Sequence, residues 1–141
     1  MHLIVYTSYA VHSFGQEELV KLRAFSASVN RFNDITGLLV FDGKRFIQAL
    51  EGEANTVIAT MNRIYNDCRH TKIVMMEDRN IVSRQFGSWS TEYRETSGTS
   101  NDAAFVDRVK SKVVNVEDDS TKAAFIGFSA LSIRRWARSS I

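Results

Sequence analysis

Two polar side chains, Tyr6 and Gln48, interrupt apolar strand patterns and could do hydrogen-bond chemistry on a buried ligand. Because side chains alternate along a strand, Gln48 shares one face with Phe46 and Leu50. A buried amide without partners costs about 1–3 kcal/mol, so Gln48 must be satisfied either by backbone or water at a sheet edge or by a bound polar ring. Tyr6 can also be interpreted as a structural residue, a half-buried tyrosine whose hydroxyl donates to a nearby acceptor in the core.

Two more amides, Asn30 and Asn33, end the apolar stripe of a helix predicted over residues 13–33. Ser13 and Gln16 resemble a capping box and predict where that helix begins. Asparagine often terminates a helix, so a C-terminal cap is one interpretation of the pair. The alternative is an amide that reads the edge of a ligand lying along the helix.

A second helix, predicted over residues 53–70, carries Arg63 and Asp67 at i, i+4 spacing. They form either a surface ion pair or two groups that hold a phosphate and a hydroxyl-bearing chain at the border of a cleft. Cys68 falls on the apolar stripe of this helix, which indicates an inert buried thiol. His70 at the helix end suits the macrodipole and needs no catalytic role.

Enzyme and metal sites find little support in the pattern. The histidines are scattered, no Ser/His/Asp or Cys/His set is readable, and no Gly-rich loop follows a strand. We therefore expect no catalytic residues and no metal. The remaining amides, the tyrosine and the apolar groups suit a cleft for a flat heteroaromatic ligand with several polar edges.

Composition indicates a soluble cytoplasmic protein. The chain has 141 residues, 44% of them hydrophobic, and a single cysteine, which excludes an internal disulfide. A net charge of +2, with both signs mixed along the chain, argues against direct nucleic-acid binding. We find neither a signal peptide nor an apolar run long enough to span a membrane.

The predicted elements alternate in a way that defines the fold class. Asp42-Gly43 predicts a type I′ turn between antiparallel strands over residues 37–41 and 44–52. Further strands are predicted at residues 2–9, 72–77 and 86–94, the last with Trp89, Thr91 and Tyr93 on one face. The order strand, helix, strand, strand, helix, strand, strand favours an α+β, ferredoxin-like sandwich with both helices on one face of a single sheet.

The last third of the chain predicts a helical extension over residues 96–141. Residues 96–101 are a predicted hinge, and two amphipathic helices follow over residues 102–114 and 120–138, with Ser120 as N-cap of the second. Their apolar stripes are expected to include Phe105, Val109, Val113, Phe125, Phe128, Leu131 and Ile133. We expect the extension either to cover the open face of the sheet or to form an interface with a second copy or a partner.

Five features in their order along the chain resemble the BLUF domain, the blue-light sensor that uses FAD. They are Val5-Tyr6-Thr7-Ser8, Asn30 six residues before Thr36-Gly37, the FIQALEG run at 46–52, Asp67-Cys68-Arg69-His70, and Arg84-x-Phe86-x-x-Trp89. The resemblance covers residues 1–95 with its spacing preserved. It implies a short, single-domain member of the family that acts through protein partners or self-association, so a homo-oligomer is expected.

The resemblance also assigns roles. Tyr6 would give an electron and a proton to the excited flavin, and Gln48 would rearrange its hydrogen bonds between Tyr6 and the ring. The other implied cofactor contacts are Leu22, Asn30, Arg31, Phe46, Arg63, Ile64, Asp67 and His70. Ser8, Trp89 and Thr91 would form the surrounding network. Thr91 departs from the family, which commonly has Met there, so the route of the signal and the lifetime of the lit state are open.

Two other functions remain compatible with the sequence. One is a ferredoxin-like regulatory module that binds a colourless metabolite instead of a flavin. The other is a flavin reductase, although no nicotinamide site is visible.

Overall fold

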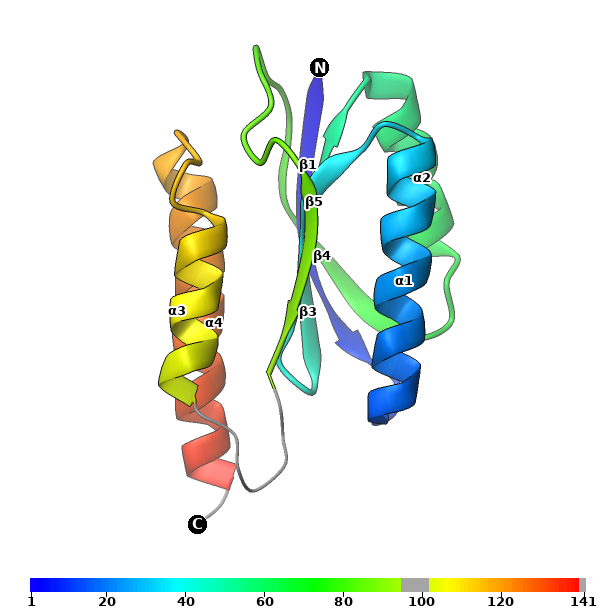
Figure 1. The fold of residues 1–141 in the computed structure, drawn as a ribbon. Coiled ribbons are helices and arrows are strands. Elements are labelled where there is room, and N and C mark those ends of the chain that lie inside the picture. The colour runs from blue at the N-terminus through cyan, green and yellow to red at the C-terminus, as the bar shows by residue number, and fades with distance from the viewer. Residues whose placement is uncertain (95–101, 140–141) are drawn as a thin grey trace.

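In the computed structural model, one five-stranded sheet lies between two layers of helices (Figure 1). The structure describes residues 1–94 and 102–139, with side chains as far as Ser132. The elements are β1 (His2–Ala10), α1 (Gln16–Phe32), β2 (Thr36–Phe41), β3 (Arg45–Gly52), α2 (Ala54–Tyr65), β4 (His70–Asn80), β5 (Trp89–Tyr93), α3 (Asp102–Lys112) and α4 (Asp119–Ser139). The predicted hinge at residues 96–101 lies outside the described residues.

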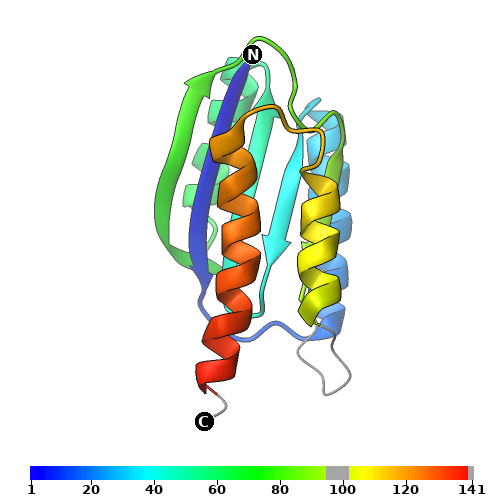
Figure 2. The ribbon, with the colours of Figure 1, turned by 90° about the vertical axis from the view of Figure 1, so that its left-hand side faces the viewer.

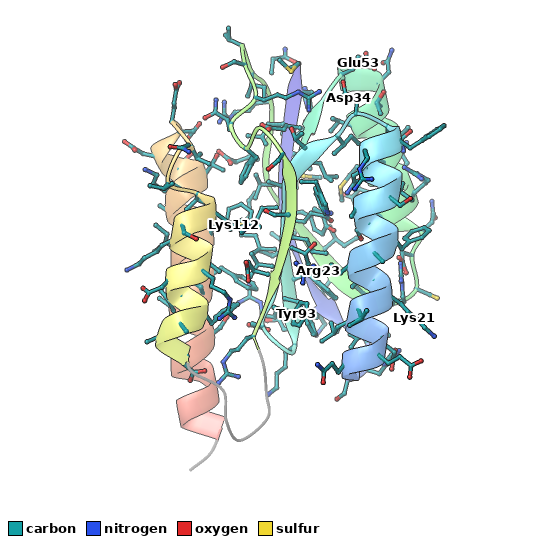
Figure 3. The ribbon with its side chains drawn as sticks, viewed as in Figure 1. Lys21, Arg23, Asp34, Glu53, Tyr93 and Lys112 are labelled. Atoms are coloured by element: carbon teal, nitrogen blue, oxygen red, sulfur yellow. The ribbon has the colours of Figure 1, made fainter. Side chains whose placement is uncertain are left out.

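The strand order is β4-β1-β3-β2-β5. The first four strands pair antiparallel, and β5 adds to β2 in parallel. Helices α1 and α2 cover one face of the sheet, which confirms the ferredoxin-like prediction (Figure 1). Asp34 and Glu53 mark the end of the sheet at which α1 finishes and α2 starts (Figure 3).

The opposite face of the sheet is covered by α3 and α4, which run side by side across it (Figure 2). Period-two alternation turns Leu3, Val5 and Ile47 toward this face, where they pack with Phe105 of α3 and Phe125 of α4. Burying such large side chains contributes about 1.5–3 kcal/mol each. Helices α3 and α4 therefore cover the second face of the sheet, which is one of the two arrangements expected for the extension.

The layer formed by α1 is packed more loosely. Asn30 is the only fully buried residue of this helix, whereas α2 buries Val57, Thr60 and Met61. A helix that attaches mainly through its apolar stripe normally buries that stripe against the sheet. Here α1 stands over a cavity instead, which is described below.

A buried carboxylate organises the connection from β4 to β5. Glu51 is fully buried on the α3/α4 side of β3, and its oxygens accept hydrogen bonds from the backbone N–H groups of Gln85 (2.6 Å), Phe86 (2.8 Å) and Gly87 (3.3 Å). Thr36 donates a fourth bond from its hydroxyl, at 2.8 Å. These partners compensate the cost of burying the charge and fix the chain immediately before β5.

The hairpin turn differs from the prediction. Gly43 has a φ of 103°, but Asp42 is not among the residues of positive φ, so the type I′ assignment is wrong. Asp42 bonds its N–H to the carbonyl of Arg45, and the loop residues are Gly43 and Lys44, with positive φ only at the first, as in a type II′ turn. The Asp42 carboxylate accepts from the N–H groups of Lys44 and Arg45 at 2.9 and 2.7 Å, which stabilises this alternative.

The second predicted helix is shorter than expected. It ends at Tyr65 with Asn66 as C-cap, so Cys68 is exposed rather than buried, and His70 is the first residue of β4 rather than the end of a helix. Local bonding explains the break, because the Asp67 carboxylate accepts a hydrogen bond from the N–H of Arg69, two residues on.

Two helix starts were also assigned to the wrong residue. Helix α1 begins after Gly15 without a side-chain cap, so the Ser13 capping box is not formed. For α4, the carboxylate of Asp118 accepts from the N–H groups of Ser120 and Thr121, so Asp118 is the cap in place of Ser120.

Other departures concern burial. Leu131, expected in the apolar stripe of α4, is half exposed, and the side chain of Ile133 lies outside the described residues. Tyr6, expected to be half-buried, is only 3% exposed. Within the described residues, no helix combines the length and the apolar character that crossing a membrane requires.

Candidate functional site

Tyr6 and Gln48 face each other across neighbouring strands. They are directly paired in the register of β1 and β3, and the Tyr6 hydroxyl donates a hydrogen bond to Oε1 of Gln48. Burial raises the pKa of the Tyr6 phenol far above its usual value, and the nearby charge of Asp67 adds to the effect. The phenol therefore stays protonated and acts as a donor.

Both side chains line a cavity of about 300 Å³ between the sheet and helices α1 and α2. The walls are largely apolar: Leu22 on α1, Ile64 on α2, and Leu39 and Phe46 on the sheet all contribute. With Oε1 of Gln48 accepting from Tyr6, the amide nitrogen of Gln48 is a donor that a ligand in the cavity could use.

A second amide, that of Asn30, lines the cavity from helix α1. Asn30 is 4% exposed, and its backbone carbonyl accepts the N–H of Ile35 at 2.8 Å, while its side chain lines the cavity. Asn33 is the C-cap of α1, and its side-chain amide donates to the carbonyl of Val29 at 3.0 Å. Asn30 therefore fits the ligand interpretation, because it lines the cavity, and Asn33 fits the cap interpretation.

Charged groups gather where α2 ends. Arg63, Asp67 and Arg69 all line the cavity, but the predicted Arg63–Asp67 ion pair is not formed. Asp67 instead pairs with Arg69 at 2.5 Å, which lowers the pKa of the Asp67 carboxyl. Arg63 donates to the hydroxyl of Thr60 at 3.3 Å and has no carboxylate partner within the described residues. It is the guanidinium available to an anion.

His70 connects the cavity to a buried serine. Its Nε2 lies 2.7 Å from the carbonyl oxygen of Ile64 and must donate there, because a carbonyl oxygen only accepts. In the neutral ring Nδ1 is then the acceptor, and it receives the hydroxyl of Ser8 at 2.8 Å. His70 lines the cavity itself, and Ser8 reaches it only through His70.

Some predicted residues do not reach the cavity. Arg31 is exposed on α1 and is not part of the lining, so a direct cofactor contact from it finds no support. Trp89 and Thr91 share one face of β5, as predicted, and this face is on the α1 side of the sheet, although neither residue is part of the cavity lining. Trp89 packs against the clusters that contain Tyr6 and Phe46, and its buried Nε1 has no hydrogen-bond partner within the described residues.

The cavity also has lining residues that the sequence analysis missed. They are Phe14, Phe25, Ser26, Val29, Leu39, Thr60 and Arg69. A signal for some of them was present, because Phe25, Ser26 and Val29 follow Leu22 at helical spacings of three, four and seven. Phe14 and Leu39 approach through tertiary packing, for which one sequence offers no comparable signal.

The residues present fit a flat heteroaromatic group. Apolar walls suit the faces of a fused ring, and the amides of Gln48 and Asn30 provide donors and acceptors for its polar edges. Arg63 can bind an anionic substituent, because its guanidinium has no carboxylate partner within the described residues. A flavin combines all three features, so fold and site define a small α+β flavin-binding domain.

Comparison with known proteins identifies the family. Residues 1–92 match the model of the BLUF family, which is described as sensors of blue light using FAD. The match covers more than half of the chain, and the chain therefore belongs to the BLUF family, whose cofactor is FAD. The resemblance found in the sequence is confirmed.

Several relatives are regulated by light. The chain is 33% identical over 87 residues to the blue light- and temperature-regulated antirepressor BluF of Escherichia coli (strain K12), covering 60% of this chain and 22% of that protein. A bacterial light-regulated adenylyl cyclase is 30% identical, with a TM-score of 0.61 over 65% of this chain and 27% of the cyclase. The chain thus spans less than a third of the length of either protein.

One solved structure resembles nearly the whole chain. The BLUF protein BlrB, in its dark state, superposes with a TM-score of 0.65 over 94% of this chain and 96% of its own, at 19% identity. At this identity the likeness shows the fold alone. That shared fold includes the helical extension, because 94% coverage goes well beyond residue 92.

Proposed function

We propose that this BLUF domain senses blue light through Tyr6 and Gln48 and passes the signal to another protein by contact. The observation that supports the proposal most strongly is the direct hydrogen bond from the buried Tyr6 hydroxyl to Gln48, at the wall of a cavity suited to a flavin. Bound FAD supplies the absorption of blue light and accepts an electron and a proton.

In this proposal Tyr6 gives up its electron and then its hydroxyl proton, and the return of both restores the phenol. While the Tyr6 bond is interrupted, the Gln48 amide rotates or tautomerises, which it can do because it carries a donor at one end and an acceptor at the other. The lasting change is a new hydrogen-bond arrangement, with no new covalent bond. It is expected to be thermally reversible and to shift the absorption to the red.

The remaining residues hold the cofactor. We propose that Asn30 binds the polar edge of the ring, while Arg63 and Asp67 meet the ribityl and phosphate part. Leu22, Phe46 and Ile64 wall the ring. His70 and Ser8 keep the end of α2 in place next to β1, since His70 bonds to both. Trp89 and Thr91 belong to the surrounding network that links the site to β5.

The output is proposed to be a protein–protein interaction, with self-association as part of it. Some relatives are much longer, such as the light-regulated cyclase, of which this chain covers 27%, and in them the BLUF domain serves as the sensor. We propose that the chain has no catalytic activity of its own and works in the cytoplasm. Neither a metal nor a direct contact with nucleic acid is part of this proposal.

The decisive experiment compares visible spectra of the purified protein before and after blue illumination. The wild type should be yellow, shift to the red when lit, and recover in darkness. Tyr6→Phe and Gln48→Leu should both bind FAD but lose this shift. Tyr65→Phe is the matched control, because Tyr65 is an exposed tyrosine of α2 outside the cavity lining. A normal red shift in Tyr6→Phe would contradict the proposed role of Tyr6.

The rival functions give different results in the same preparation. A protein that stays colourless after FAD is added would favour a regulatory module for a colourless metabolite. Oxidation of NAD(P)H by the yellow protein would reveal a flavin reductase.

A further inference from the structure

Phe25 is an aromatic side chain that belongs both to the cavity and to the protein surface. It lines the cavity, yet it is 58% exposed to solvent. Single exposed phenyl groups are common on protein surfaces and need no explanation. A phenyl group at the mouth of a ligand cavity is different, because an extended ligand leaving that mouth must pass it.

Two other exposed aromatic side chains on the same helical layer provide a comparison. Phe32, one helical heptad after Phe25, is 90% exposed, and Tyr65 on α2 is 52% exposed. Neither belongs to the lining of the cavity. Exposure of an aromatic ring is therefore not peculiar to Phe25, but its position at the opening is.

The size of the cavity determines what lies outside it. A volume of about 300 Å³ is at the small end of the range for ligand pockets, so a ligand as long as a dinucleotide is expected to extend beyond the cavity. The inner end is marked by Tyr6 and Gln48, and the opening by Phe25, Arg63 and Arg69, all three exposed. With the isoalloxazine ring against Tyr6 and Gln48, the adenosine half of FAD would lie toward the opening.

The two arginines at the opening differ in how available they are to the phosphates of FAD. Arg69 is already neutralised by Asp67, whereas Arg63 has no carboxylate partner within the described residues. If Arg63 on α2 holds the diphosphate, the adenosine would lie near the lining residues of α1, among which Phe25 is a largely exposed aromatic side chain. Purine bases stack on aromatic side chains because both present flat π surfaces.

We propose that Phe25 stacks on the adenine of FAD and thereby gives the domain a preference for the dinucleotide over FMN and riboflavin. The inference rests on the proposed function, because it takes the isoalloxazine ring to lie against Tyr6 and Gln48. It adds a second, outer subsite whose ligand is a purine base. This subsite sets the choice of cofactor without taking part in the light reaction.

The test measures three affinities for the full chain. The protein is loaded separately with FAD, FMN or riboflavin, and free flavin is measured by ultrafiltration at a series of dilutions. Phe25→Ala should weaken the binding of FAD about 5- to 150-fold, which is the range for loss of one base–aromatic stack. FMN and riboflavin lack the adenine, so their affinities should stay within about twofold of the wild type. Phe25→Trp should keep or strengthen the preference for FAD.

Phe32→Ala is the matched control and should change none of the three affinities. Equal weakening of all three flavins by Phe25→Ala would mean that Phe25 covers the isoalloxazine ring, and would overturn the proposal. Unchanged affinities would overturn it as well. A red shift on illumination of the FMN- or riboflavin-loaded protein tests the light reaction separately, so the proposed function can stand while the adenine subsite fails.

Discussion

Ser132 on α4 donates a hydrogen bond to Oδ2 of Asp42 in the turn between β2 and β3, at 2.6 Å and across 90 residues of sequence. Both side chains are almost completely buried. The other oxygen of Asp42 holds the turn itself, through the N–H groups of Lys44 and Arg45. The helical extension is thereby attached to the turn that leads into the strand carrying Gln48.

Ser132→Ala should destabilise the protein by about 1–3 kcal/mol, because a buried carboxylate oxygen loses its hydroxyl donor. Urea unfolding measures the change. Ser129→Ala is the control, since Ser129 is equally buried but its hydroxyl donates to the carbonyl of Ile126 within its own helix. Equal losses for both variants would show that the bond to Asp42 adds nothing specific.

Glu51→Gln should cost about 2–3 kcal/mol of unfolding free energy and expose the connection before β5 to proteolysis. The amide keeps one acceptor but turns an NH₂ group toward backbone donors, which leaves buried N–H groups unsatisfied. Denaturant unfolding and limited proteolysis test this expectation. Glu53→Gln, a change at an exposed helix cap, should leave the connection intact. Unchanged protease resistance in Glu51→Gln would refute the assigned role.

Tyr6 makes stability depend on alkaline pH. Its pKa is raised in the folded protein, whereas the unfolded chain releases the phenolic proton near pH 10. Folded protein therefore binds more protons than unfolded protein above about pH 10, so stability falls with rising pH by about 1.4 kcal/mol per unit from this group. Tyr6→Phe should remove that component from the pH profile of unfolding. Identical slopes in the two proteins above pH 10 would contradict it.

His2 adds a dependence at pH values above about 6.5. A hydrogen bond to the carboxylate of Asp78 raises the pKa of His2 above the usual histidine value of about 6.5. The stabilisation is fully present below about pH 6.5 and is lost as the pH rises through the folded value. Asp78→Asn should therefore destabilise the protein more at about pH 5.5 than at about pH 8.5, as followed by thermal unfolding. Glu17→Gln, at an exposed residue of α1, should show no such difference.

The parts of the site that the sequence predicts are those set by local periodicity. Alternation places Tyr6 and Gln48 each on a defined face of its strand, and helical spacing places Asn30 on the ligand side of α1. The direct pairing of Tyr6 with Gln48 depends on the long-range register of β1 and β3. The pairing of these two residues was expected only from the resemblance to a family, because periodicity within one strand does not reveal which strand lies beside it.

The errors arose where side chains compete with regular backbone bonding. Cys68 fits the apolar period of α2, but the turn made by Asp67 ends the helical pattern before it. Ser13 fits a capping box, but Phe14 packs against Phe41 and Phe46, with ring centroids 5.6 and 6.0 Å apart, and the helix begins only afterwards. Such choices between local and tertiary contacts are not visible in a single sequence.

Because α1 covers the cavity and buries few residues of its own, the stability of the folded chain should depend on the supply of its vitamin-derived cofactor. Helix α1 buries only Asn30 among its residues, and several of its other side chains line the cavity, where a bound flavin would contact them. Ligand binding to the native state stabilises it in proportion to the logarithm of ligand concentration. Cells short of flavin should therefore hold fewer intact copies of this sensor, so its abundance would report nutrition as well as light.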